Sequence, residues 1–265
     1  MQRKVIKQGN GSYTVTLPKK WTNLFEIDQT KTVTMSVKGD TLLIHTGSTK
    51  AQRYELDLQL IKNSKTIRMI LVELYRKGMD VIIIKNYTQD NLFSIKKELQ
   101  SLQGFQITSQ SEKIIQIEFI FGPSMSDEYQ KYIQRMFYIL IEFCSDNSNI
   151  QLQDTFATLN NFLRRLLYKR DVVNREYYTI ILNSLSRVMH QIKTIDYTKN
   201  ELSRISFYLK TTLGLFQKFH ITTFNKTVEQ LQKDIVDKKN MEVQGSFRDI
   251  YNTLSRILVL NYLAD

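Results

Sequence analysis

The spacing of apolar residues changes twice along this chain of 265 residues. Up to residue 50, apolar and polar residues alternate in short stretches between turn residues, which is typical of strands and hairpins. Residues 51–122 combine helical spacing with short apolar runs, and residues 123–265 show helical spacing almost throughout. The pattern predicts an α+β protein with three domains, which comprise residues 1–50, 51–122 and 123–265.

Residues 1–50 are expected to form two hairpins with one short helix between them. The turn Gly9-Asn10-Gly11 joins the first two strands, because glycine tolerates positive φ. Pro18 suits the first position of a helix that ends at about Phe25, because proline has no N–H to leave unpaired there. This unit is too small to enclose a core alone, so we expect it to dimerise. The expected strands are residues 4–7, 13–17, 32–37 and 41–45.

Residues 51–122 are expected to form a small α/β unit. A helical apolar pattern over residues 61–77 ends at Gly78, which suits a helix C-terminus. The run Val81-Ile82-Ile83-Ile84 predicts a buried strand within residues 80–85. The other expected elements are a helix over residues 89–102 and strands over residues 105–109 and 114–121.

Glycine and proline become rare after Pro123, which indicates long helices. Seven of the nine glycines and both prolines lie at or before that residue, so we place a domain boundary near residues 121–125. Six amphipathic stripes follow, and they predict a bundle of six helices with the stripes as its core. Leu185-Ser186-Arg187-Val188 and Leu254-Ser255-Arg256-Ile257 share one pattern, with Leu202-Ser203-Arg204-Ile205 between them. The outer pair favours two tandem repeats of three helices.

The net charge of +11 is unevenly distributed. Residues 1–50 carry eight basic and three acidic side chains, so they supply +5 of the +11. This asymmetry favours a polyanionic partner, although a solvated basic surface would have the same composition. A second basic cluster is expected to be a solvated helix end, with an anionic partner surface as the alternative. It comprises Arg164, Arg165, Lys169, Arg170 and Arg175.

Cys144 is the only cysteine, so no intramolecular disulfide is possible and a reducing compartment fits. The N-terminus is basic but lacks an apolar signal core, and the longest apolar stretches fall far short of the ~20 residues that a membrane span needs. These features predict a cytoplasmic protein without membrane insertion.

The sequence gives little support for catalysis. His45, His190 and His220 have no nearby cysteine and no metal-ligand spacing. Nucleophile elbows, phosphate-cradling glycine loops and dinucleotide fingerprints are absent from the sequence. Glu142 and Asp146 share one helix face, but an isolated pair of this kind is typical of a solvated helix end. We therefore expect no enzymatic activity, no catalytic residue and no cofactor.

The opening stretch carries the residue types that bind double-stranded DNA. A phosphate backbone needs distributed cations and N–H donors, while base edges need forked donors such as arginine. Arg3 is therefore the expected base-reading residue, and the lysines are expected to contact phosphates. The predicted DNA-binding residues are Arg3, Lys4, Lys7, Asn10, Ser12, Lys19 and Lys20.

The first 46 residues resemble the AbrB/MazE/SpoVT group of DNA-binding domains. The matching features are the basic opening Arg3-Lys4-Val5, the glycine-flanked turn, the run Val15-Thr16-Leu17-Pro18-Lys19-Lys20-Trp21 and the closing strand Leu42-Leu43-Ile44. The resemblance implies a swapped-hairpin β-barrel, that is, a homodimer in which strands from both chains interleave and cations from both converge on one duplex. Such swapping would also close the open sheet edges.

The whole chain resembles the archaeal phosphate-uptake regulators that join such a domain to a PhoU-like helical domain. The segment from Leu74 to Ile83 is similar to the middle of that family, and the C-terminal helices are similar to its two three-helix repeats. The resemblance implies a transcriptional regulator of phosphate uptake or related metabolism, with the helical bundle as a sensing or partner-docking domain. The alternative is an adaptor that docks on a transporter or kinase, with residues 1–50 serving mainly for dimerisation.

The chain departs from the PhoU pattern at the places where paired acids bind metal in that family. Ser186 and His190 occupy one pair of places, and Ser255 and Val259 occupy the other. A hydroxyl, an imidazole and an aliphatic side chain do not offset the charge of a multivalent cation. We therefore predict that the purified protein holds no metal cluster. Elemental analysis after purification without chelator tests this, and one equivalent of iron, zinc or manganese retained through dialysis would contradict it.

Overall fold

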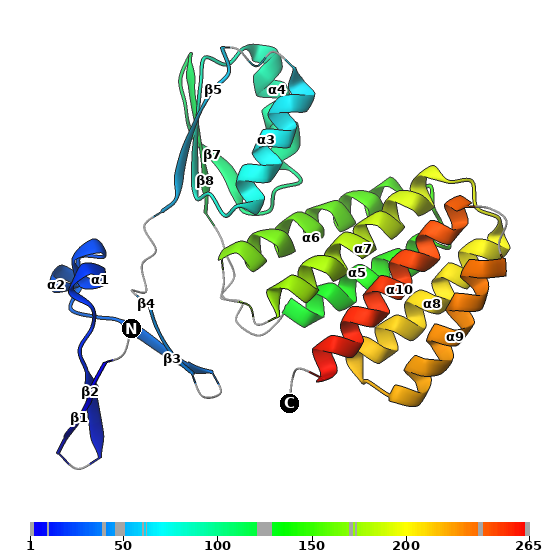
Figure 1. Ribbon diagram of the computed structural model, residues 1–265. Helices are drawn as coiled ribbons and strands as arrows, with labels where there is room; N and C mark the ends of the chain where they lie inside the picture. Colours follow the sequence, from blue (N-terminus) through cyan, green and yellow to red (C-terminus); the bar gives the residue numbers. More distant parts are fainter. Residues whose placement is uncertain are drawn as a thin grey trace. The chain divides into compact units, whose positions relative to one another are not determined.

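The computed structural model describes residues 3–9, 11–38, 41–45, 51–59, 61, 63–120, 129–169, 172, 174–237 and 241–262. Within these residues the protein is α+β, with small sheets in its N-terminal half and a helical region at its C-terminal end (Figure 1). At this level the predicted fold class is confirmed. The chain divides into two compact units, Met1–Gln52 and Arg53–Asp265. The predicted boundary near residues 121–125 lies outside the described residues.

The first unit contains two separate hairpins. Strands β1 (Val5–Gln8) and β2 (Ser12–Val15) pair antiparallel, as do β3 (Thr34–Lys38) and β4 (Thr41–His45). Two short helices, α1 (Lys19–Leu24) and α2 (Ile27–Thr30), lie between the hairpins along the chain. Both glycines of the first turn have positive φ, as predicted: 56° at Gly9 and 94° at Gly11.

The prediction for Pro18 is wrong by one residue. Pro18 has an extended backbone with ψ of 125°, so it caps α1 and Lys19 is the first helical residue. The carbonyl of Pro18 accepts the N–H groups of Trp21 at 2.9 Å and of Thr22 at 3.0 Å. The carbonyl of Pro18 therefore accepts the first hydrogen bonds of the helix. The missing N–H of proline costs nothing at this position, because the N–H groups at the start of a helix have no partner within the helix.

No side chain is buried among those residues of the first unit whose exposure the structure describes. The two sheets are separate there, and no closed barrel forms within the described part of one chain. Many apolar side chains are exposed instead, for example Val37 at 79% and Tyr13 at 67%. One copy of this unit therefore leaves most of its apolar surface in water, at a cost that scales with the exposed area. The predicted dimeric barrel stays a prediction.

The second unit begins with a four-stranded sheet of order β5-β6-β8-β7. Its strands are β5 (Arg53–Asp57), β6 (Val81–Lys85), β7 (Phe105–Gln110) and β8 (Ile114–Phe119). Strand β5 runs parallel to β6, whereas the other neighbours are antiparallel. Helices α3 (Ser64–Arg76) and α4 (Gln89–Leu99) cover one face of the sheet (Figure 1) and bury a common apolar core with it.

The end of α3 confirms the role predicted for Gly78. Gly78 has φ of 77°, its N–H donates to the carbonyl of Tyr75, and the N–H of Met79 donates to the carbonyl of Leu74. These two bonds form a Schellman motif, which favours glycine at this position. A Cβ on Gly78 would also lie 2.9 Å from Cγ of Lys169, so the absent side chain admits a neighbouring helix.

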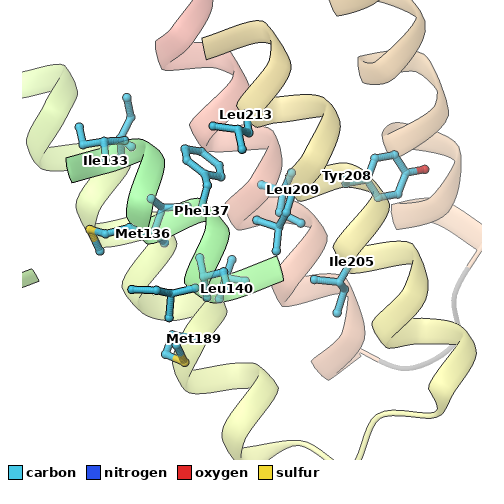
Figure 2. Packing of buried hydrophobic residues seen from close by; sticks show 14 of the residues in the cluster. Ile133, Met136, Phe137, Leu140, Met189, Ile205, Tyr208, Leu209 and Leu213 are labelled. Carbon is cyan, nitrogen blue, oxygen red and sulfur yellow. The ribbon is translucent and has the colours of Figure 1, made fainter. Parts of the chain in front are cut away.

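Six helices form the C-terminal region within its described residues, one for each predicted stripe. They are α5 (Tyr129–Phe143), α6 (Ile150–Lys169), α7 (Arg175–Thr194), α8 (Lys199–Gln217), α9 (Ile221–Asp237) and α10 (Met241–Tyr262). The stripes pack as a single core, part of which is shown in Figure 2, where Phe137 and Leu140 of α5 approach Leu209 of α8. None of the described helices combines the length and apolar character that a bilayer crossing requires.

Candidate functional site

The predicted DNA-binding residues of the first hairpin are all exposed where the structure describes them. Arg3 and Lys4 precede β1, and Lys7 lies within it, opposite Tyr13 of β2. Since side chains alternate along a strand, Lys7 and Tyr13 share one face of the hairpin. Asn10 lies outside the described residues. The hairpin thus presents cations and apolar groups together to solvent.

Ser12 has a structural role that its residue type alone did not reveal. Its Oγ donates to the carbonyl of Gln8 at 2.5 Å, and this bond links the two ends of the turn that contains Gly9 and Gly11. The hydroxyl oxygen keeps its lone pairs, so Ser12 remains a hydrogen-bond acceptor for a ligand.

Lys19 and Lys20 occupy the first turn of α1, and both are exposed. Cations are unfavourable at this end of a helix, because the free N–H groups carry partial positive charge. The first turn contains no acid to offset them. An anion placed against the helix start would therefore offset the charge of both lysines.

These residues can bind an extended polyanion. Five cations within residues 3–20 are exposed, and no acidic residue occurs in that stretch of the sequence. Distributed cations of this kind bind a phosphate backbone through a salt-dependent release of counterions. Comparisons with protein-family models, with curated proteins and with solved structures found no match to this chain. The two resemblances noted in the sequence therefore stay predictions.

Arg165 belongs to the second basic cluster, which we expected to be a solvated helix end. For Arg165 this expectation is wrong. The side chain of Arg165 is only 2% exposed. Its Nη1 donates to the carbonyls of Tyr75 at 3.0 Å and Met79 at 2.8 Å, and its Nη2 donates to Oδ1 of Asp80 at 2.9 Å. The guanidinium also lies 4.0 Å from the centre of the Phe119 ring. Helix α6 is thereby joined to the turn between α3 and β6.

Asp80 is shared between two cations of α6. Lys169 donates from Nζ to Oδ2 of Asp80 at 2.6 Å, while Arg165 uses the other carboxylate oxygen. Burial lowers the pKa of Arg165, and the negative charge of Asp80 opposes that shift. Arg170 of the same sequence cluster lies outside the described residues.

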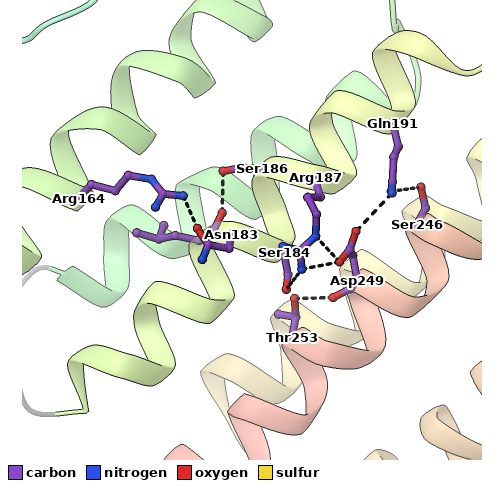
Figure 3. Close-up of polar contacts among 10 residues, drawn as sticks. Arg164, Asn183, Ser184, Ser186, Arg187, Gln191, Ser246, Asp249 and Thr253 are labelled. Carbon is purple, nitrogen blue, oxygen red and sulfur yellow. Dashed lines mark hydrogen bonds and ion pairs between the residues drawn. The ribbon is translucent and has the colours of Figure 1, made fainter. Parts of the chain in front are cut away.

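Two arginines of the recurring Leu-Ser-Arg tetrapeptide bind buried aspartates. Arg187 of α7 donates from Nε to Oδ1 of Asp249 on α10 at 2.7 Å (Figure 3). Arg204 of α8 forms an ion pair with Asp234 of α9, which also accepts the hydroxyl of Tyr208 at 2.5 Å. The tetrapeptides at 185–188 and 202–205 thus share an arginine–aspartate contact with a neighbouring helix. The tandem repeat was predicted from a different pair, the tetrapeptides at 185–188 and 254–257.

At the positions where the PhoU resemblance implies acids, the serine side chains form hydrogen bonds within their own helices. Ser186 and Ser255 each donate their hydroxyl to a carbonyl four residues earlier, in Leu182 at 2.6 Å and Tyr251 at 3.0 Å. His190 is exposed, and no group of three or more possible metal ligands occurs among the described residues. Burial raises the pKa of the Cys144 thiol to about 12, which disfavours a reactive thiolate.

Asp80→Asn should destabilise the second unit by about 3 kcal/mol, because it leaves a buried guanidinium without its counter-charge. Chemical denaturation followed by circular dichroism measures this. Glu112→Gln is the matched control, since Glu112 is exposed between β7 and β8 and its change should stay within about 0.5 kcal/mol. Equal stabilities of the two variants would contradict the role assigned to the Arg165–Asp80 pair.

Gly245→Ala and Gly214→Ala should have opposite effects on stability. A Cβ on Gly214 meets nothing within 4 Å, so alanine should stabilise α8 by about 0.5–1 kcal/mol. A Cβ on Gly245 would lie 2.8 Å from Nε2 of Gln191, which bonds Asp249 in Figure 3. Displacing that amide should cancel the helix gain and cost about 1 kcal/mol. Thermal unfolding of both variants checks this, and an equal gain would contradict the predicted cost of displacing the Gln191 amide.

Proposed function

We propose that the protein is a DNA-binding transcriptional regulator whose residues 3–20 contact the duplex. The observation that carries this proposal is the exposed basic stretch without an acid, in which Lys19 and Lys20 stand at a helix start where they oppose the helix dipole. The mixture of an arginine for base edges and lysines for phosphates suits sequence-specific binding. No enzymatic step is part of this proposal.

We propose further that the DNA-binding form is a homodimer through residues 1–50. The exposed apolar side chains of both hairpins support this, because a second copy would remove them from water. A barrel with interleaved strands would also pair the free edges of the two-stranded sheets. Two copies of the basic stretch would then act on one duplex.

The helical region is proposed to sense a signal or to dock a partner protein. Its core is continuous and its buried acids are already paired with arginines, so it supplies a rigid body and not a reactive site. Phosphate uptake as the regulated process follows only from the resemblance to the archaeal regulators.

The fragment 1–50 and the full chain should both sediment as dimers at micromolar concentration. The reason is the apolar surface that one copy leaves exposed, including Val5, Val15 and Leu24. Analytical ultracentrifugation measures the mass directly. If circular dichroism shows a folded fragment and sedimentation shows a monomer, the swapped-barrel proposal is wrong.

Lys19→Ala combined with Lys20→Ala should weaken DNA binding on every sequence. The slope of log K against log salt should fall by roughly 0.9 for each phosphate that the lysines no longer neutralise. Arg3→Ala should instead reduce the preference for specific over random DNA, because a guanidinium reads guanine edges. Fluorescence anisotropy over a range of salt concentrations measures both effects, on genomic sites recovered with the intact protein.

The control for these variants is Lys96→Ala combined with Lys113→Ala, which removes two exposed lysines from the second unit. This control should bind DNA like the parent protein. If the Lys19/Lys20 and Arg3 variants also bind like the parent, residues 3–20 are not the DNA surface, and an adaptor function becomes the better explanation.

A further inference from the structure

Helices α3, α4 and α6 of the second unit enclose a cleft of about 650 Å³. This volume lies within the range of small-molecule sites. The wall formed by α3 includes Ser64, Arg68, Val72 and Arg76, which recur every four residues and therefore share one helix face, and Lys65 lies beside Ser64. The cleft is polar as well as apolar, so it differs from a packing gap between apolar surfaces. We call it the α3–α4–α6 cleft.

One of the two carboxylates in this cleft is already neutralised. Glu98 is buried, and its Oε2 lies 2.6 Å from Nε of Arg68. Its Oε1 accepts the hydroxyl of Ser101 at 2.9 Å. The other carboxylate is that of Asp154 on the α6 side. The charged side chains that line the cleft are Lys65, Arg68, Arg76, Lys97, Glu98 and Asp154.

The cations are partly preorganised for an anion. Nε and Nη2 of Arg76 donate to Oδ1 of the buried Asn161, at 3.0 Å and 2.8 Å, which fixes the guanidinium on the cleft wall. Nη1 of Arg76 donates to Oε1 of Glu73 at 2.8 Å, so this guanidinium already has a carboxylate partner outside the cleft lining. Lys65 and Lys97 are exposed, and no carboxylate lies within ion-pair distance of either among the described residues. Arg68 and Arg76 each have a carboxylate partner, so the unpaired positive charge of the cleft lies on Lys65 and Lys97. A polyanion in the cleft would offset that charge.

An aromatic ring stands beside these cations. Phe93 lines the cleft and is 72% exposed, so its ring is accessible to a ligand. It lies four residues before Lys97 on α4, so the ring and the ammonium group are neighbours on one helix face. A flat aromatic ring next to phosphate-binding cations matches a ligand with a planar base and a chain of phosphates.

We propose that the α3–α4–α6 cleft binds a nucleoside polyphosphate. Lys65, Lys97 and Arg76 bind the phosphates, and Phe93 stacks on the base. This binding site is independent of the DNA-binding proposal, because it lies within the second unit and uses none of residues 3–20.

Isothermal titration calorimetry of the full chain with ATP, without magnesium and at physiological salt, tests this inference. One ATP should bind per chain, and Lys65→Ala and Lys97→Ala should each weaken binding about tenfold. Phe93→Ala should weaken ATP binding about tenfold and leave the binding of inorganic tripolyphosphate unchanged.

Two controls separate this cleft from other basic surfaces. Lys96→Ala removes the adjacent exposed lysine of α4 that does not line the cleft, and it should bind ATP like the parent protein. The Lys19/Lys20 double variant should also bind ATP normally, whatever its effect on DNA. The inference is overturned if ATP shows no binding at millimolar concentration, if the Lys65 and Lys97 variants bind like Lys96→Ala, or if Phe93→Ala affects ATP and tripolyphosphate equally.

Discussion

The guanidinium of Arg165 needs a counter-charge and hydrogen-bond acceptors, because it is almost completely withdrawn from water. Asp80 supplies the charge, two backbone carbonyls accept from Nη1, and aromatic rings cover the face of the group. All of these partners belong to the α/β layer, whereas Arg165 belongs to the helical region. The contact therefore fixes α6 against the turn after α3, and the α3–α4–α6 cleft exists because α6 is held in that place.

Local pattern was sufficient to predict most of the helical region. Each predicted stripe became one helix, because an amphipathic helix of 15 to 22 residues is specified by its own apolar spacing. Strand β5 was missed because Arg53–Asp57 contains a single buried residue, Leu56, and reads as a polar segment. It is a strand because it pairs with the strongly apolar β6. This pairing is a tertiary interaction, so it could not be predicted from the spacing of residues within β5.

The candidate sites differ in how far the sequence alone could reveal them. The basic stretch of residues 3–20 is contiguous, so charge and turn chemistry were enough to predict an exposed basic surface. The partners of Arg165 lie 85 to 90 residues away, so its burial could not be inferred from a local cluster of cations. One signal was present in the sequence, since α6 has apolar or amide residues on nearly every face around Asn160–Leu163, as expected of a helix packed on two sides.

The separation between Arg165 and its partners has a consequence for biosynthesis. Asp80 leaves the ribosome 85 residues before Arg165, which at about 5–20 residues per second corresponds to roughly 4–17 s. During that interval the carboxylate of Asp80 lacks both cations of α6, and the carbonyls of Tyr75 and Met79 lack the guanidinium of Arg165. The nascent α/β layer is thus incomplete until α6 emerges. A chaperone would be most useful in the period between the synthesis of Asp80 and that of Arg165, when these polar groups lack their partners on α6.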